Sequence, residues 1–172
     1  MKPKSERLAA GRLVLKPLED RDKAALLRMA SDERIKRTYM LPDFRSEAEA
    51  DAFFARMQAL CASDAHFVYG IFLEGDLIGF LNDCEADETS MELGYFIDPA
   101  CWGRGCASEA LRAAIGELFR MGFARVTAGY FEENPASRRV MEKCGMRPLP
   151  QSTVIPYRGV DHRCLYYGID RT

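Results

Sequence analysis

The fold is decided by the stretch Asp98-Pro99-Ala100-Cys101-Trp102-Gly103-Arg104-Gly105-Cys106-Ala107-Ser108-Glu109-Ala110. From its last residues onward, apolar side chains recur at helical spacing: Ala107, Ala110, Leu111, Ala114, Ile115, Leu118 and Phe119. This spacing predicts an amphipathic helix of about four turns, and Gly122 is placed to end it. The stretch therefore joins the end of one element, through a loop that contains glycines, to the start of a helix.

The segments on either side of this helix have the patterns of strands. Residues 91–97 are a mainly apolar run that stops at Asp98-Pro99, and residues 125–130 alternate between polar and apolar side chains. Runs of this kind, bounded by turn residues, are typical of strands. A strand, a helix and a second strand in this order form a crossover unit, so we expect the two strands to be parallel.

The remaining apolar runs indicate further strands, most of them in hairpins. Leu13–Leu18 is the expected first strand, and Pro17 indicates that it lies at an edge or ends there. Residues 67–73 and 77–82 are joined by a short polar turn and predict one hairpin. Residues 153–157 and 162–169, on either side of Arg158-Gly159, predict a second hairpin at the end of the chain.

Three more helices are indicated by their N-terminal signals. Asp20 is a candidate N-cap for a helix that reaches about Ala30, and Ser46-Glu47-Ala48-Glu49 is a capping box before an apolar pattern that continues to Leu60. Asn134-Pro135 opens the last helix, and Gly145 is placed to end it. Together the elements predict a mixed α/β (α+β) fold in a single domain of residues 1–172. Its sheet is mostly antiparallel with about seven strands, accompanied by about four helices.

Composition excludes several classes of protein. The chain has 172 residues, of which 48% are hydrophobic and 29% charged, and its formal net charge is −2. These values argue against a disordered chain and a coiled coil, and a nucleic-acid binder that relies on bulk charge would be clearly basic. No run approaches the about 20 apolar residues of a membrane span. The charged N-terminus lacks the apolar region of a secretory signal, so we expect a cytoplasmic protein with neither nucleic acid nor membrane as a partner.

The cysteine and histidine pattern predicts no metal. The six cysteines, at 61, 84, 101, 106, 144 and 164, contain no Cys-x-x-Cys pair, and the chain has two histidines, His66 and His162. The spacing fits neither a zinc ribbon nor a thioredoxin motif. We therefore expect free thiols in a reducing compartment.

The loop before the central helix has the composition of an anion site. Gly103, Gly105 and Ala107 are small, so backbone N–H groups can face a ligand without hindrance. The first N–H groups of a helix have no internal partner and lie at the positive end of its dipole, which suits a phosphate. Arg104 adds a positive charge. A simple glycine turn before a core helix is the alternative interpretation. No Gly-x-x-x-x-Gly-Lys-Ser/Thr motif is present, and no Gly-x-Gly-x-x-Gly motif opens the first strand and helix.

The sequence resembles the GNAT acetyltransferase superfamily from about residue 5 to residue 170. Four segments in the same order carry the resemblance: residues 92–99, residues 102–110, Asn134-Pro135-Ala136-Ser137 and Cys144-Gly145-Met146. Within the superfamily the chain is similar to the RimJ/RimL-type N-acetyltransferases, which acetylate ribosomal-protein N-termini and related amines. The opening residues 6–8 and 12–18 are similar to the first strand of that group.

The resemblance implies acetyl-CoA as co-substrate and assigns the residues that bind it. In this fold the strand at 91–97 splays from its parallel neighbour and acetyl-CoA enters the gap. The family pattern Gln/Arg-x-x-Gly-x-Gly/Ala binds the pyrophosphate through backbone N–H groups, and here it begins at Trp102, a departure from Gln or Arg. The residues expected at the cofactor are Phe96, Ile97, Gly103, Arg104, Gly105, Cys106, Ala107, Ser108 and Asn134. Phe96 and Ile97 would offer backbone groups to the pantetheine.

Two residues are expected to be catalytic. Superfamily members commonly have a tyrosine acid seven residues after the asparagine, where this chain has Met141, which has no proton to donate. Ser137, three residues after the asparagine, is the expected substitute, and an ordinary serine in a first helical turn is the alternative. Glu92 is the only carboxylate within residues 91–97 and is the expected general base; an outward-facing strand glutamate is its alternative. No clustered acids or partner bases accompany the histidines or the loop cysteines.

The expected reaction is direct attack of a neutral amine on the thioester of acetyl-CoA. An α-amino group with a pKa of about 7.7–8.0 is far more often neutral near pH 7 than a lysine with a pKa of about 10.4. A protein or peptide α-amine is therefore the expected acceptor. The alternatives are a small-molecule amine (an antibiotic, a polyamine or an amino acid) or a non-catalytic acyl-CoA-binding regulatory module. An acidic loop at Asp83, Glu85, Asp87 and Glu88 would suit a polyamine, and a solvated surface loop is the alternative interpretation. Formation of a homodimer is left open.

Overall fold

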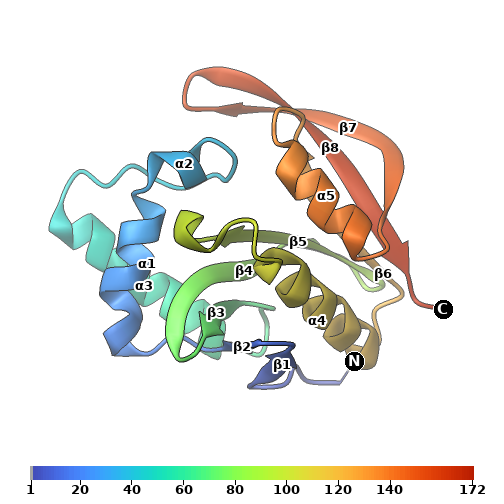
Figure 1. The fold of residues 1–172 in the computed structure, drawn as a ribbon, viewed down its shortest axis with the longest axis horizontal. Coiled ribbons are helices and arrows are strands. Elements are labelled where there is room, and N and C mark those ends of the chain that lie inside the picture. The colour runs from blue at the N-terminus through green and yellow to red at the C-terminus, as the bar shows by residue number, and fades with distance from the viewer. Residues whose placement is uncertain (1) are drawn as a thin grey trace.

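One mixed sheet runs through the computed structural model, which describes residues 2–172 (Figure 1). Its eight strands lie in the order β1-β2-β3-β4-β5-β6-β8-β7, and every neighbouring pair is antiparallel except β5–β6. The strands are β1 (Leu8–Ala10), β2 (Leu13–Lys16), β3 (Tyr69–Leu73), β4 (Asp76–Ala86), β5 (Ser90–Ile97), β6 (Arg125–Phe131), β7 (Arg147–Tyr157) and β8 (Val160–Asp170). The expected mixed, mostly antiparallel α/β fold is confirmed.

The central crossover forms as its sequence pattern predicts. Helix α4 (Cys106–Met121) connects the parallel strands β5 and β6. Its apolar stripe is buried against the sheet, with Leu111, Ala114 and Leu118 fully inaccessible to solvent. Gly122 ends the helix at φ +119°, a backbone conformation in which a β-carbon would be strained.

The two parallel strands separate part of the way along their length. Ser90–Leu93 of β5 pairs with Arg125–Ala128 of β6, and beyond that point the two strands no longer pair. β5 continues to Ile97 bonded to β4 alone, and β6 continues to Phe131 bonded to β8 alone. The sheet therefore opens into a wedge between residues 94–97 and 129–131, as the resemblance led us to expect.

The N-terminal quarter differs in detail from the sequence prediction. The edge of the sheet is β1, whose three residues are too few to show an alternating pattern, so Pro17 marks the end of β2 and not an edge. Asp20 lies inside a short 3₁₀ turn (Asp20–Asp22) with Glu19 as its N-cap, and helix α1 begins only at Lys23 and ends at Ala30. Helix α2 (Glu33–Lys36) is one turn long and was not expected.

Helices cover both faces of the sheet and enclose two apolar cores. Helices α4 and α5 (Pro135–Lys143) lie on one face, and helices α1, α2 and α3 (Glu47–Ala62) lie on the other (Figure 1). Ser46 caps α3 as predicted, since its hydroxyl accepts a hydrogen bond from the Glu49 amide at 3.2 Å. No helix among residues 2–172 is long and apolar enough to cross a membrane.

The β7–β8 hairpin reaches across to the segment around α2. Its turn, Arg158-Gly159, has positive φ at both residues, which suits a two-residue hairpin turn. The Arg158 guanidinium contacts the Glu33 carboxylate at 2.7 Å, and the Tyr157 hydroxyl lies 3.3 Å from both the amide and the carbonyl of Leu41. We call this link, made by Arg158 and Tyr157, the strap.

The buried carboxylate of Glu117 ties the N-terminal segment to α4 and pairs with the half-exposed Arg120, and this arrangement carries a prediction about stability. Glu117 accepts hydrogen bonds from the Ser5 amide and the Arg120 guanidinium, both at 2.6 Å, and the Arg120 partner lowers its pKa to about 2. Glu117→Gln should lower the free energy of unfolding at pH 7 by about 1.5 kcal/mol, the lower end for charged hydrogen bonds because Arg120 is 42% exposed. Urea denaturation measures this difference.

The stabilisation by Glu117 depends on pH with a definite sign. A depressed carboxyl pKa stabilises the folded state above the ordinary glutamate value of about 4.3, and the contribution is lost as pH falls through about 2. The matched control is Glu132→Gln, because Glu132 and Arg163 pair at 3.3 Å with more than half of each side chain exposed. Glu132→Gln should change the free energy of unfolding by no more than about 0.5 kcal/mol. Equal effects of the two substitutions would contradict the assignment.

Candidate active site

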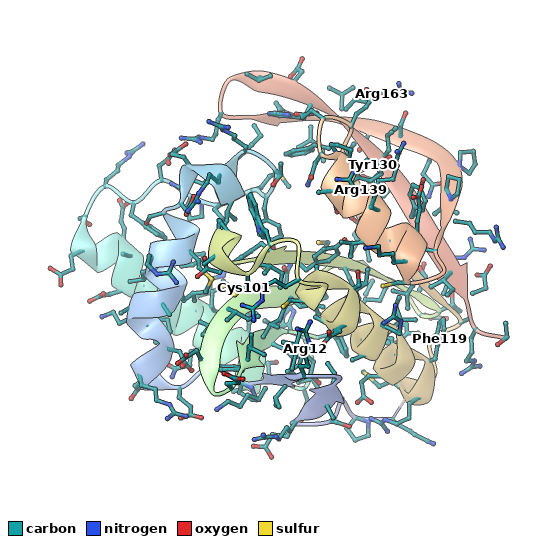
Figure 2. The ribbon with its side chains drawn as sticks, viewed as in Figure 1. Arg12, Cys101, Phe119, Tyr130, Arg139 and Arg163 are labelled. Carbon is teal, nitrogen blue, oxygen red and sulfur yellow. The ribbon has the colours of Figure 1, made fainter. Side chains whose placement is uncertain are left out.

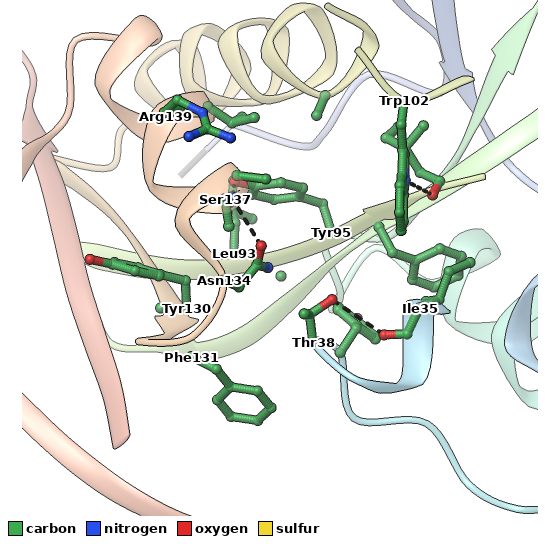
Figure 3. Close-up of a pocket in the computed structure, with 18 of the residues that line it drawn as sticks. Ile35, Thr38, Leu93, Tyr95, Trp102, Tyr130, Phe131, Asn134, Ser137 and Arg139 are labelled. Atoms are coloured by element: carbon green, nitrogen blue, oxygen red, sulfur yellow. Dashed lines mark hydrogen bonds between the residues drawn. The ribbon is translucent and has the colours of Figure 1, made fainter. Parts of the chain in front are cut away.

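A cavity of about 890 Å³ lies in the wedge between β5 and β6 (Figure 3). Its walls come from β5 and β6, the loop before α4, one side of α5, the segment around α2 and parts of β4 and β8. Its volume is within the range of sites for cofactor-sized ligands. Among the residues expected to bind acetyl-CoA or to act in catalysis, all line this cavity except Arg104: Glu92, Phe96, Ile97, Gly103, Gly105, Cys106, Ala107, Ser108, Asn134 and Ser137.

The loop before α4 presents free backbone donors to the cavity. Within residues 2–172, no hydrogen bond takes up the amide N–H groups of residues 103–108. Gly103 and Gly105 have φ of +73° and +81°, and a β-carbon at Gly103 would meet nothing within 4 Å. The loop is therefore an open concave surface of N–H groups at the positive end of a 16-residue helix, which is a suitable site for a phosphate group.

A charged contact supports this loop from the side of β1 and β2. The Arg12 guanidinium donates to the Arg104 carbonyl and to the Glu109 carboxylate, both at 2.6 Å. Glu109 also accepts from the Arg12 amide at 3.0 Å. The Arg104 side chain is directed to the Cys101 sulfur at 3.9 Å and is not part of the cavity wall. We expected the positive charge of Arg104 to lie in the cavity, but the structure places it beside the cavity.

Trp102 occupies the position where the family pattern has Gln or Arg. Its indole N–H donates to the Ile97 carbonyl at 2.7 Å, and half of the residue is exposed at the cavity wall (Figure 3). The contact fixes the loop against the end of β5. The Ile97 carbonyl oxygen therefore already accepts one hydrogen bond and has one lone pair left for a ligand.

Two cations on α5 line the cavity and were missed by sequence reasoning. Arg139 and Lys143 are one helical turn apart, and both line the cavity. Figures 2 and 3 show Arg139 on α5. No carboxylate among residues 2–172 forms a salt bridge with either side chain. Helical periodicity counted from Ala136 would have placed Arg139 and Lys143, three and seven residues later, on the side of the helix that faces the site. These charges favour an anionic ligand between α4 and α5.

Asn134 and Ser137 are brought together at the start of α5. Asn134 is the N-cap, and its side-chain oxygen accepts from the Ser137 amide at 3.4 Å. The Ser137 hydroxyl lies 3.1 Å from the hydroxyl of Tyr95 on β5 (Figure 3). Met141 is fully buried in the apolar core. Tyr95 was not singled out from the sequence, because a tyrosine in a strand gives no local signal of a polar partner on a later helix.

Glu92, on β5, also lines the cavity. It is half-buried on β5, and no hydrogen bond among residues 2–172 ends on its carboxylate. Burial, and then the charge of Glu85 on the neighbouring strand, raise its pKa. A carboxylate that is unpartnered and has a raised pKa can accept a proton near neutral pH.

The two expected catalytic residues approach the wedge from opposite faces of the sheet. Successive side chains of a strand point to opposite faces. Leu93 and Ile97 pack in the core that includes α4, whereas Phe96 packs in the core that includes α1 and α3. Tyr95 therefore shares the α4 face with its partner Ser137, and Glu92 faces the side of the strap. The open wedge is where groups from the two faces can meet.

Several residues considered from the sequence have structural roles. Cys101 and Cys106 are buried, and burial raises the pKa of the Cys106 thiol, which keeps it uncharged. Asp87 holds a turn by accepting from the Thr89 and Ser90 amides, and these bonds lower its pKa to about 2. No member of the acidic loop lines the cavity. Residues 2–172 contain no cluster of three or more potential metal ligands.

Comparisons with known proteins agree with this geometry. Residues 12–147 match the acetyltransferase (GNAT) domain family. The chain is 28% identical over 145 residues to the uncharacterized N-acetyltransferase YoaA of Bacillus subtilis (strain 168), covering 81% of this chain and 82% of that protein. A GNAT-family acetyltransferase structure from Bacillus anthracis superposes with a TM-score of 0.81 at 26% identity, covering 95% of this chain and 98% of the other.

A further solved structure shares the fold at lower identity. It is RimL, described as a ribosomal L7/L12 alpha-N-protein acetyltransferase in complex with coenzyme A, with a TM-score of 0.81 at 18% identity. The match covers 96% of this chain and 98% of that one. Because the family match spans most of the sequence, the chain belongs to the GNAT acetyltransferase family. It is an N-acetyltransferase whose fold is similar to the RimJ/RimL type.

Proposed function

We propose that this protein transfers an acetyl group from acetyl-CoA to the α-amine of a protein or peptide. The observation that carries the use of acetyl-CoA is the loop of free N–H groups at residues 103–108, open to a cavity between splayed strands. Backbone donors at a helix N-terminus fit a diphosphate. Arg139 and Lys143 add the positive charge that a nucleotide with three phosphate groups requires.

The roles of the chain's own residues follow from their positions. The loop and Asn134 hold the acetyl donor in the wedge, so that proximity and orientation supply a large part of the rate enhancement. Glu92 accepts the proton that the attacking amine gives up, directly or through a water molecule. Ser137, on the opposite face, directs its hydroxyl to the departing sulfur. Met141 has no part in proton transfer.

The strap supports an acceptor that enters end-on. Arg158 and Tyr157 connect the hairpin to the segment around α2, and both sides of this link line the cavity, through Ile155 and Thr38. A site bordered by this link is less suited to a lysine in the middle of an extended chain. A chain terminus or a compact amine fits it.

The charges of the cavity argue against a polyamine as the acceptor. The cavity wall contains Arg37 on the side of the strap and Arg139 and Lys143 on α5, while Arg34 is paired with Asp32 at 2.7 Å; among residues 2–172, Glu92 is the one carboxylate in the wall. A polycation would meet like charges there, which is unfavourable. The RimL structure with the same fold is described as an α-N-protein acetyltransferase, and this supports an α-amine for the present chain.

Two measurements test the proposal. Calorimetry with acetyl-CoA should detect binding, and release of the CoA thiol should be followed with a panel of peptides, amino acids, aminoglycosides and polyamines. A peptide with a free N-terminus should release thiol, and the same peptide with an acetylated N-terminus and an internal lysine is the matched control. Release with small amines alone would overturn the proposed acceptor. Absence of acetyl-CoA binding would overturn the proposed co-substrate.

A further inference from the structure

The hydrogen bond between Tyr95 and Ser137 joins the two sides of the wedge. Tyr95 lies on β5 beyond the point where β5 leaves β6, and Ser137 lies in the first turn of the helix that follows β6. Their hydroxyl oxygens are 3.1 Å apart, and both residues line the cavity (Figure 3). The contact is therefore placed beside any ligand that occupies the wedge.

The direction of this hydrogen bond decides what Ser137 can do. A serine hydroxyl has one proton. If Ser137 donates that proton to Tyr95, none remains for a ligand. If Tyr95 donates to Ser137, the serine proton is free to point into the cavity. Burial raises the pKa of Tyr95 and keeps its phenol protonated, and no other acceptor for the phenol is present among residues 2–172. Both facts favour Tyr95 as the donor.

We propose that Tyr95 is a positioning residue for the transfer step, which orients the Ser137 hydroxyl towards the departing sulfur of coenzyme A. The inference rests on the proposed function of the cavity. Two hydroxyl groups in series do the work of the single tyrosine acid that is common in the superfamily and that Met141 replaces here. Because Tyr95 is anchored in a strand, it holds Ser137 in one rotamer at little entropic cost.

The proton and electron balance of the step is complete. The amine nitrogen forms a bond to the acetyl carbon, and the bond from that carbon to sulfur breaks with its electron pair remaining on sulfur. Ser137 donates a hydrogen bond to the thiolate while Tyr95 donates to Ser137, so neither hydroxyl has to become an anion. The proton released by the amine passes to Glu92, and the thiolate is protonated from solvent when it leaves, consistent with an ordinary thiol pKa of about 8.5.

A double-mutant cycle tests this role. Ser137→Ala should lower kcat by about 100-fold, the usual loss when a hydrogen-bond donor to a developing anion is removed, and Tyr95→Phe, which keeps the ring, should lower kcat by about tenfold, each with little change in KM for acetyl-CoA. Tyr95→Phe should cost almost nothing in the Ser137→Ala background, because residues that act through one another are not additive. If the loss in kcat of the double variant equals the product of the two single losses, the proposal is overturned.

A second readout needs no acceptor. The pKa of the thiol of bound coenzyme A, followed by the ultraviolet absorbance of its thiolate, should be higher than in the parent protein by about one unit in Tyr95→Phe and by about two units in Ser137→Ala, and the double variant should match Ser137→Ala. The matched control is Tyr167→Phe, because Tyr167 donates to Glu142 at 3.0 Å away from the cavity. Bound coenzyme A that titrates in Tyr95→Phe as in the parent, while Ser137→Ala differs, would overturn the role of Tyr95 alone. Identical titration in all variants would also remove Ser137 as the donor, and failure to bind coenzyme A would overturn the proposed function as well.

Discussion

Replacing Ala107 with aspartate should weaken binding of acetyl-CoA by at least about 100-fold and leave the protein as stable as before, or more stable. Ala107 is the second residue of α4 and lines the cavity. A carboxylate there would lie against the diphosphate, and two like charges about 4 Å apart near a protein surface repel by about 4 kcal/mol. The same carboxylate would interact favourably with the helix dipole by about 0.3–1 kcal/mol. Binding and stability should therefore change in opposite directions.

Ala107→Asn is the matched control, since asparagine has the shape of aspartate without its charge. Its loss of affinity should be well below that of the aspartate variant. Calorimetry measures binding, and thermal unfolding measures stability. If Ala107→Asp binds acetyl-CoA as the parent does, the loop at residues 103–108 is a structural turn and the anion site lies elsewhere. Equal losses in both variants would point to steric hindrance in place of electrostatics.

The order of elements and the glycine-containing loop before α4 were predictable because their signals are local. The apolar stripe of α4, the glycines at its start and the Asn134 cap each depend on residues within one or two turns of one another. Local backbone preferences and periodicity determine such features. The separation of β5 from β6 is not local, and it was expected only through the resemblance to a family.

The contacts that complete the site could not be predicted from the sequence, because they join residues far apart in the chain. Tyr95 and Ser137 are separated by 42 positions, and Arg158 and Glu33 by 125. No spacing rule relates such pairs. Arg104 shows the converse case: its place in the loop suggested a charge in the cavity, but the Arg12 contact and the Cys101 sulfur direct its backbone and side chain elsewhere.

Glu92→Gln should lower kcat/KM at neutral pH by about 10²- to 10⁴-fold, the usual contribution of a positioned proton acceptor. The shape of the pH profile identifies the group. Burial and Glu85 raise the pKa of Glu92, so activity of the parent protein should fall with decreasing pH along a limb centred above the ordinary value of about 4.3. In the variant that limb should be absent, whereas the limb of the acceptor amine, at its pKa of about 7.7–8.0, should remain in both proteins because each needs a neutral amine.

Glu85→Gln supplies the control that separates a base from a structural carboxylate. Glu85 is exposed, lies opposite Glu92 in the β4–β5 pairing and is not part of the cavity wall. Removing its charge should lower the pKa of Glu92 and move the acid limb to lower pH while the plateau rate stays unchanged. A limb that stays in place in Glu85→Gln and persists in Glu92→Gln would belong to another group, and Glu92 would then be excluded as the base.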